Sequence, residues 1–310
     1  MARPKGVSEM VATKDMPLKE YVLKGNAACA GCQDMVALRH AHKALEGDVI
    51  QVVPACCTSV VQSLWPKSGL GIPVLNTAFM ASGATASGVK AALKAKGNDH
   101  TMVMVWAGDG GTFDIGIQAL SGAFERRTDF LYICYNNQVY SNTGTQRSGA
   151  TPLYAQTTTT WFGKPEPEKM LDFIVAAHEP VYQFTANTAY PRDLYDKFKK
   201  AREFEGPKFG HIFLPCPQAW NYPVEKAVEI GKLAVETGYW IQWERVGDEF
   251  TLGNHSKRFQ DPAKRKPIDE FLKMQGRFSH LFKPKRDDKK IKEFENFIQH
   301  RWDMLMRTFT

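Results

Sequence analysis

The sequence has 310 residues, of which 43% are hydrophobic, and a formal net charge of +7. This length and composition predict a globular protein with a sizeable core, either one large α/β domain with an appendage or two domains. No stretch is long and apolar enough for a membrane span, and the charged N-terminus lacks the apolar core of a signal peptide, so we expect a cytoplasmic protein. The basic residues concentrate at 255–267 and 282–292 without a nucleic-acid-binding motif, which favours an exposed face or an acidic protein partner over nucleic acid.

The first part of the chain presents two pairs of cysteines. After an irregular lead-in over residues 1–25, the small-residue turn GNAACAGCQ places Cys29 and Cys32 ahead of an amphipathic helix over 35–45. A short apolar strand over 49–53 then ends in PACCTSV, which contains Cys56 and Cys57. Because a cytoplasmic chain rarely forms disulfides, the C-x-x-C pair indicates a metal site or a redox pair.

The next segment predicts a strand-helix-strand unit. Residues 73–79 form a strand, and an Ala/Gly/Ser-rich helix follows over 81–97. Gly83, Ser87 and Gly88 in this helix permit close approach of a neighbouring element. The helix leads to the apolar strand over 102–107.

A second strand-helix-strand unit adjoins the first. The runs 102–107 and 130–135 predict parallel strands, whose following turns lie at one edge of the sheet, where ligands bind. The helix between them has one apolar face, formed by Phe113, Ile117, Leu120 and Phe124.

The turns after these strands suit a diphosphate held by a hard cation. Gly108, Gly110 and Gly111 leave room for a large anion beside the backbone. Asp109 offers a carboxylate and Asn137 an amide oxygen, ligands typical of a Mg²⁺ ion that keeps sites free for phosphate oxygens. A lone Gly-Asp-Gly is more often a structural turn. Because an Asn pair follows one strand later, we interpret this Gly-Asp-Gly as part of a binding site and not as a structural turn.

Alternating helices and strands continue to a further cysteine. The polar, Thr-rich segment 145–164 predicts a loop that closes over a cofactor or meets another subunit. Helices over 170–177 and 190–204 and strands over 181–185 and 208–214 follow, and the last strand ends at Cys216 between two prolines. Thiolates from Cys29, Cys32, one of Cys56 and Cys57, and Cys216 would suit an iron-sulfur cubane or structural zinc. Cys134 lies inside an apolar strand and is expected to be a buried small hydrophobe.

The pattern changes beyond Trp220. A hairpin over 237–252, a short helix over 268–274 and a charged helix over 289–306 predict an arm that packs on a partner subunit or a cap on the chain's own core. We therefore expect a cofactor-binding α/β domain over 1–220 and a C-terminal extension over 221–310.

Together these segments resemble the β subunit of the 2-oxoacid:ferredoxin oxidoreductases, of which pyruvate:ferredoxin oxidoreductase is the best-known member. The resemblance implies a thiamine diphosphate-binding α/β fold with a mostly parallel sheet flanked by helices. It covers nearly the full length and rests on ACAGC at 28–32, GDGGTFDIGIQALSGAFER from 108, YNNQVYSNTGTQRS from 135, TPLYAQTTT from 151, GHIFLPCP from 210, AVETGYW from 234 and LKMQGRF from 272.

The same resemblance implies a set of site residues. A proximal 4Fe-4S cluster would be bound by Cys29, Cys32, Cys57 and Cys216, while Cys56 stands where members usually have glycine. Asn142 is expected to make a polar contact near the thiazolium and the substrate. Mg²⁺ and the diphosphate would be held by Asp109, Asn137 and the carbonyl of Val139, with Gly108, Gly110, Gly111 and Thr143 at the diphosphate.

The implied activity is oxidative decarboxylation of a 2-oxoacid, with electrons passed to the cluster and on to ferredoxin or a similar acceptor and the acyl group usually to coenzyme A. Pyruvate is the default substrate, and an aryl glyoxylate or oxalate is the alternative because the segment PACCTS differs from the usual pyruvate type. An α subunit supplies the activating glutamate and the main substrate contacts, γ- and δ-type subunits complete the complex, and the chain alone is expected to be inactive. A zinc-stabilised basic binding module is the alternative from another class.

Overall fold

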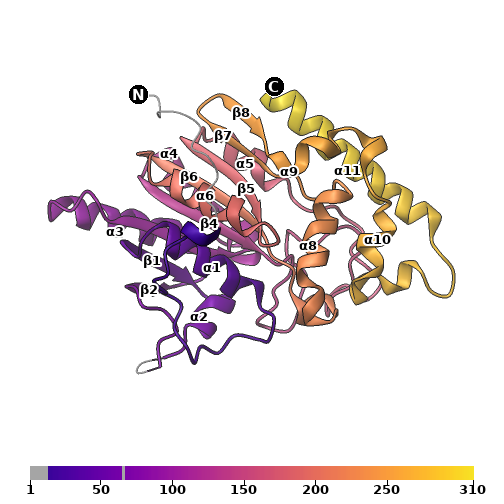
Figure 1. Ribbon diagram of the computed structural model, residues 1–310, viewed down its shortest axis with the longest axis horizontal. Helices are drawn as coiled ribbons and strands as arrows, with labels where there is room; N and C mark the ends of the chain where they lie inside the picture. Colours follow the sequence, from indigo (N-terminus) through magenta and orange to yellow (C-terminus); the bar gives the residue numbers. More distant parts are fainter. Residues whose placement is uncertain (1–12, 65–66) are drawn as a thin grey trace.

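A single sheet organises the described residues, 13–64 and 67–310, of the computed structural model (Figure 1). Its strand order is β2-β1-β3-β4-β6-β5-β7-β8. The strands from β1 to β6 pair in parallel, whereas β7 pairs antiparallel with β5 and β8 antiparallel with β7. Their bounds are β1 Val49–Pro54, β2 Val74–Thr77, β3 Met102–Gly108, β4 Phe130–Asn136, β5 Tyr182–Asn187, β6 Pro207–Phe213, β7 Trp243–Val246 and β8 Glu249–Leu252.

Helices cover both faces of the sheet, as the alternation along β3 requires. Met104 and Trp106 pack in one apolar cluster with α1 and α6, while Val103 and Val105 pack in another with α3, α4 and α5. Successive side chains of a strand point to opposite faces, so one strand contributes to both layers. The helices are α1 Gln33–Ala44, α2 Cys57–Val61, α3 Ser82–Ala95, α4 Ile117–Glu125, α5 Leu171–Ala176, α6 Pro191–Ala201, α7 Pro217–Trp220, α8 Ala227–Glu236, α9 Asn254–Lys257, α10 Ile268–Lys273 and α11 Asp288–Phe309.

These elements confirm the predicted α/β class with a mostly parallel sheet. The predicted strands and helices up to residue 214 are present, with bounds that differ by a few residues. The segment 145–164 is irregular, as expected. No helix in the described ranges is long and apolar enough to cross a membrane.

The C-terminal part differs in detail from its prediction. We did not predict α8, although its buried Ala227, Ile230 and Ala234 follow a helical period. The predicted hairpin is shorter, and it extends the main sheet through β5. Helices α8, α10 and α11 lie together on the side of the molecule opposite α3 (Figure 1) and share an apolar cluster with Phe213 and Trp220. The proposed division at residue 220 stays a prediction.

Two glycines of α3 lie in different environments. A Cβ at Gly83 would lie 2.5 Å from the carbonyl oxygen of Ala119 in α4, whereas a Cβ at Gly88 would meet nothing within 4 Å. The expected close approach is therefore confirmed at Gly83 and wrong at Gly88, which faces away from the neighbouring helix.

These environments predict opposite effects of alanine. Gly83→Ala must push α3 from α4, so we expect it to lower the free energy of unfolding by about 1–3 kcal/mol. Gly88→Ala removes a flexible residue from an exposed helix interior and should raise that free energy by about 0.5–1 kcal/mol. Urea unfolding of both variants checks the signs, and a shift in the same direction for both would contradict this packing.

Candidate functional site

The three predicted Mg²⁺ ligands lie together at the carboxyl edge of β3 and β4. Asp109 follows β3 directly, and Asn137 and Val139 follow β4. One amide atom of Asn137 lies 3.0 Å from Asp109 Oδ1 and 2.7 Å from the carbonyl oxygen of Val139. The neighbouring Asn136 is committed elsewhere, because its side chain bonds the ring of His211 and the backbone of Gln138. The second residue of the pair is thus the one directed to Asp109.

The Asn137 amide has two orientations with different consequences. With its nitrogen toward Asp109 it donates to Asp109 Oδ1 and to the Val139 carbonyl, while its oxygen accepts from Ser141 Oγ. With its oxygen toward Asp109, three oxygens face one point and the nitrogen donates to Ser141 Oγ at 2.9 Å. The second orientation is the donor set of a hard cation such as Mg²⁺. These residues therefore fit the expected metal.

Burial makes the Asp109 carboxylate dependent on a counter-charge. The residue is 1% exposed, and burial raises the pKa of Asp109 to about 7, although the hydroxyl of Ser148 donates to Oδ2 and opposes the shift. A bound cation would favour the charged form. Ser148 comes from the irregular segment 145–164, and no sequence signal identified it.

The turn 137–139 is held in its shape from outside. Gln138 has a φ of 67°, in the left-handed region that non-glycine residues rarely adopt. Its side chain accepts from Arg277 Nη2 at 2.6 Å and donates to the hydroxyl of Tyr239. Arg277 is buried and stacks on Trp220, 3.8 Å from the ring centroid, and Trp220 Nε1 donates to the carbonyl of Asn137 at 2.7 Å. We did not predict roles for Arg277 or Trp220.

The glycines of the Gly-Asp-Gly-Gly turn lie under aromatic side chains. A Cβ at Gly110 would lie 2.2 Å from the ring of Tyr140, and one at Gly111 would lie 3.1 Å from the ring of Phe79. Tyr140 also donates to Asp114 Oδ2 at 2.8 Å. Gly110 is thus required by the chain itself, and its contact with a diphosphate stays a prediction, as does that of Gly108.

Asn142 and Thr143 lie on the exposed turn beside this site. The turn is closed by a bridge between Tyr140 and Gln146, and Thr143 Oγ1 bonds the side chain of Gln146. Both residues are exposed, so a cofactor or a partner subunit can reach them. Their proposed roles are not tested by these contacts.

The four predicted cysteine ligands lie on three neighbouring segments. Cys57 begins α2 after β1, and Cys216 precedes α7 after β6. The C-x-x-C turn reaches α7, since a Cβ at Gly31 would lie 3.5 Å from Pro217. Burial raises the pKa of Cys32 and of Cys57 to about 12, and charge on Cys216 adds to both shifts. The thiols are therefore near enough to affect one another, and a bound metal would be needed to deprotonate them.

The cysteines are not gathered around a single point. Within 13–64 and 67–310, no three Cys, His, Asp or Glu side chains are close enough to bind one metal ion. Structural zinc requires four ligands around one ion. In a cubane each thiolate binds a different iron, so its sulfurs stand further apart. Four thiols on neighbouring segments are the donor set of a cubane, and the presence of the cluster stays a prediction.

The adjacent cysteines point to different partners. Cys57 Sγ lies 3.1 Å from Ser141 Oγ, beside the turn after β4. The Cys56 thiol is buried, which raises its pKa, while a hydrogen bond with Tyr135 lowers it. The two thiols thus have different surroundings, and the choice of Cys57 as the ligand stays a prediction.

A buried carboxylate, Asp34, joins two of the cysteine segments. It follows the C-x-x-C turn in α1 and accepts from Thr58 Oγ1 at 2.7 Å and from Trp106 Nε1 at 2.9 Å. Asp34 thereby fastens α1 to α2 and β3. We did not predict this role, and its only sequence signal is an acidic residue at the start of an otherwise apolar helix face.

Replacing Asp34 by Ala would leave two buried donors without partners. We expect the free energy of unfolding to fall by about 2–4 kcal/mol and the iron of the predicted cluster to be lost faster from the purified protein. Urea unfolding and timed iron release measure both effects. Asp99→Ala, at an exposed position, is the control; equal behaviour of the two variants would contradict the fastening role.

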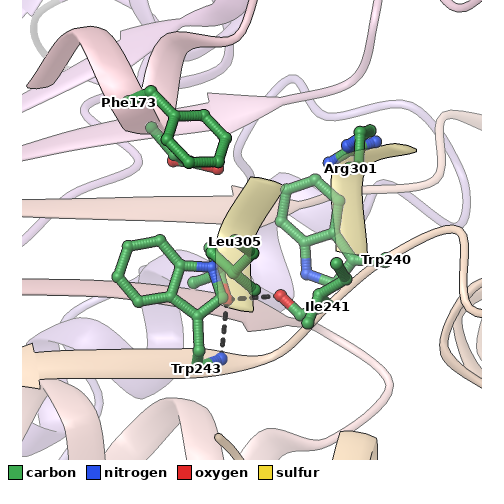
Figure 2. A pocket seen from close by; sticks show the side chains of 8 residues that line it. Phe173, Trp240, Ile241, Trp243, Arg301 and Leu305 are labelled. Carbon is green, nitrogen blue, oxygen red and sulfur yellow. Dashed lines mark hydrogen bonds between the residues drawn. The ribbon is translucent and has the colours of Figure 1, made fainter. Parts of the chain in front are cut away.

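A small hollow lies elsewhere, beneath α11. Figure 2 shows Phe173, Trp240, Trp243 and Arg301 around it, and the hydroxyl of Thr185 bonds the backbone of β7 and the residues before it. None of the proposed cofactor-binding residues lines this hollow. The candidate site is therefore the edge of the sheet, where the partner subunit is expected to complete the pocket.

Comparison with known proteins identifies the family of this chain. Residues 58–212 match the family described as thiamine pyrophosphate enzyme, C-terminal TPP binding domain. The chain is 42% identical over 304 residues to ketoisovalerate oxidoreductase subunit VorB of Pyrococcus abyssi, covering 94% of each chain. It is 43% identical over 271 residues to pyruvate synthase subunit PorB of Methanothermobacter thermautotrophicus, covering 86% of this chain and 92% of the relative.

A solved structure shares the fold. The 2-oxoglutarate:ferredoxin oxidoreductase from Magnetococcus marinus matches with a TM-score of 0.57 and 19% identity, covering 70% of this chain and 82% of the other. The fold and the matched domain define a thiamine pyrophosphate enzyme. Within that class, the chain belongs to the β subunits of the 2-oxoacid:ferredoxin oxidoreductases.

Proposed function

We propose that this chain is the thiamine diphosphate- and 4Fe-4S-binding subunit of a complex that oxidatively decarboxylates a 2-oxoacid and passes the electrons to ferredoxin or a similar acceptor. The observation that carries the proposal is the convergence of Asp109 Oδ1, the Asn137 amide and the Val139 carbonyl at the edge of the sheet where Cys57 and Cys216 also lie. One edge would thus provide oxygen ligands for Mg²⁺ and thiolates for iron.

The residues of this chain bind and orient the cofactor. Thiamine diphosphate, when bound, supplies the nucleophilic carbon and takes up the electrons of decarboxylation. Asp109, Asn137 and Val139 would hold Mg²⁺, and Asn142 would contact the substrate side. The diphosphate would lie beside Gly108, Gly110, Gly111 and Thr143.

The electron acceptor within the chain is a cluster bound by Cys29, Cys32, Cys57 and Cys216. The cluster would lie next to the metal-binding turn, because Ser141 contacts both Cys57 and Asn137 and Trp220 joins α7 to Asn137. Short separation favours electron transfer from the cofactor to the cluster.

The substrate is a 2-oxoacid, with pyruvate as the default. The relatives above are named for pyruvate and for ketoisovalerate. An aryl glyoxylate or oxalate is the alternative substrate, because the segment PACCTS, which includes Cys56, differs from the usual pyruvate type. Coenzyme A takes the acyl group where one is transferred.

Partner subunits complete the enzyme. An α subunit would supply the activating glutamate and the substrate carboxylate contacts, and γ- and δ-type subunits would carry electrons to the external acceptor. The isolated chain should therefore be inactive, and a cytoplasmic location belongs to the same proposal.

Anaerobic purification of the complex tests these proposals. We expect iron, Mg²⁺ and thiamine diphosphate in the purified complex, and 2-oxoacid-dependent reduction of a low-potential acceptor across a panel of pyruvate, ketoisovalerate, 2-oxoglutarate, phenylglyoxylate and oxalate. A colourless protein that contains zinc and no iron would favour the basic binding module instead. Full turnover by the isolated chain would contradict the need for partners.

A further inference from the structure

Ser141 stands between the two halves of the proposed site. Its Oγ lies 3.1 Å from Cys57 Sγ and 2.9 Å from the amide of Asn137. Cys57 is a proposed cluster ligand and Asn137 a proposed Mg²⁺ ligand. The motifs that identify the family assign no role to Ser141, although its hydroxyl is the direct link between these ligands.

A serine hydroxyl has one proton to donate, so only one of these neighbours receives it. When the Asn137 nitrogen faces Asp109, the Asn137 oxygen faces Ser141 and accepts its proton. In this orientation Asn137 also donates to Asp109 Oδ1 and to the Val139 carbonyl, which satisfies the amide without a metal. The Cys57 sulfur then receives no hydrogen bond from Ser141.

Mg²⁺ binding would reverse this arrangement. Asn137 must turn its oxygen to the cation, which places its nitrogen against Ser141 Oγ as a donor. Ser141 then accepts from Asn137, and its own proton points to Cys57 Sγ. The identity of the amide atom facing Asp109 thus determines the direction of the whole chain of hydrogen bonds.

A hydrogen bond to a cluster thiolate stabilises the more negative, reduced state and raises the reduction potential. We infer that Ser141 is a positioning residue through which binding of Mg²⁺ and thiamine diphosphate raises the reduction potential of a cluster bound by Cys57. This inference rests on the proposed function. By thermodynamic linkage, the chain with a reduced cluster binds Mg²⁺ and thiamine diphosphate more tightly than the oxidised form.

Redox titration of the complete complex tests the inference. The complex is purified anaerobically and titrated with and without Mg²⁺ and thiamine diphosphate, and the cluster is followed by electron paramagnetic resonance. Its signal is assigned by its absence in Cys29→Ser. We expect the cofactor-loaded wild type to have a higher potential than the cofactor-free form.

Ser141→Ala should shift the reduction equilibrium of the cluster in the cofactor-loaded complex about tenfold toward the oxidised state. This shift lowers the reduction potential by about 59 mV for one electron. It should also reduce the rise in the reduction potential on cofactor binding, because only the direct effect of the bound charges persists. Ser141→Thr keeps a hydroxyl and should behave as wild type. Ser59→Ala is the matched control, since the Ser59 hydroxyl bonds the backbone of Cys56 and not a cysteine sulfur.

Equal potentials and equal cofactor responses in Ser141→Ala and wild type would overturn the inference. If the alanine variant loses its cluster, the reduction potentials of Ser141→Thr and Ser141→Val are compared instead. These two side chains have the same shape and differ in the hydroxyl. A wild-type complex without iron or a cluster signal would overturn the proposed function itself, which is a different result from equal potentials.

Discussion

Asp109→Asn is expected to weaken binding of Mg²⁺ and thiamine diphosphate by at least about 100-fold, or about 2.8 kcal/mol, and to abolish turnover of the complex. Asp109 is the one carboxylate among the three proposed oxygen ligands, and its burial strengthens its interaction with a cation. An amide in its place leaves the cation without a charged ligand from this chain. Calorimetric titration of the metal-free complex with thiamine diphosphate at fixed Mg²⁺ measures the loss.

The same substitution should not destabilise the metal-free protein. Asn keeps an oxygen that accepts from Ser148, and it removes a buried charge, so we expect the free energy of unfolding to stay the same or to rise by about 1–2 kcal/mol. Thermal unfolding in a chelator measures this effect. Asp99→Asn, at an exposed position, should change neither quantity. Normal cofactor affinity in Asp109→Asn would exclude Asp109 as a metal ligand, and a large loss of stability would indicate a structural role instead.

The sequence was sufficient to predict the residues that directly follow strands. Asp109 and Asn137 follow β3 and β4, and Cys57 and Cys216 come after β1 and β6, so the parallel pairing of these strands places all four at one edge. This outcome needs only the order of apolar runs and the rule that the carboxyl ends of parallel strands meet. The class of fold follows from the same reasoning and is confirmed, while the position of the candidate site stays a prediction.

Residues that support the site from a distance could not be predicted this way. Arg277 reaches Gln138 across 139 positions in the chain, and Gln138 itself adopts a left-handed conformation that asparagine or glycine would have signalled better. Ser148 reaches Asp109 from an irregular segment without periodicity. The ring of Tyr140 fills the space above Gly110, where the pattern of glycines alone predicted room for an anion. Each of these contacts depends on tertiary packing and not on local pattern.

Cys57→Ser is expected to remove the cluster from the complex, whereas Cys56→Ser should retain it. Cys57 contacts the hydroxyl of Ser141, and charge on Cys216 adds to the rise in the pKa of Cys57. Cys56 instead forms a hydrogen bond with Tyr135 in β4. Loss of one thiolate leaves one iron of the cubane without its protein ligand, so we expect loss of about four iron atoms per chain.

Three measurements on anaerobically purified complexes show whether each variant retains the cluster. They are the iron per chain, the acid-labile sulfide per chain and the visible absorbance. Cys29→Ser, Cys32→Ser and Cys216→Ser should behave as Cys57→Ser. Cys134→Ser is the matched control, because Cys134 is buried in β4 within the apolar cluster of α3 and α4. Iron retained in Cys57→Ser but lost in Cys56→Ser would transfer the ligand role to Cys56. It would also separate the cluster from Ser141, since that hydroxyl contacts Cys57. Coupling between the cluster and the Mg²⁺ site would then require another route, such as the hydrogen bond from Trp220 to the carbonyl of Asn137.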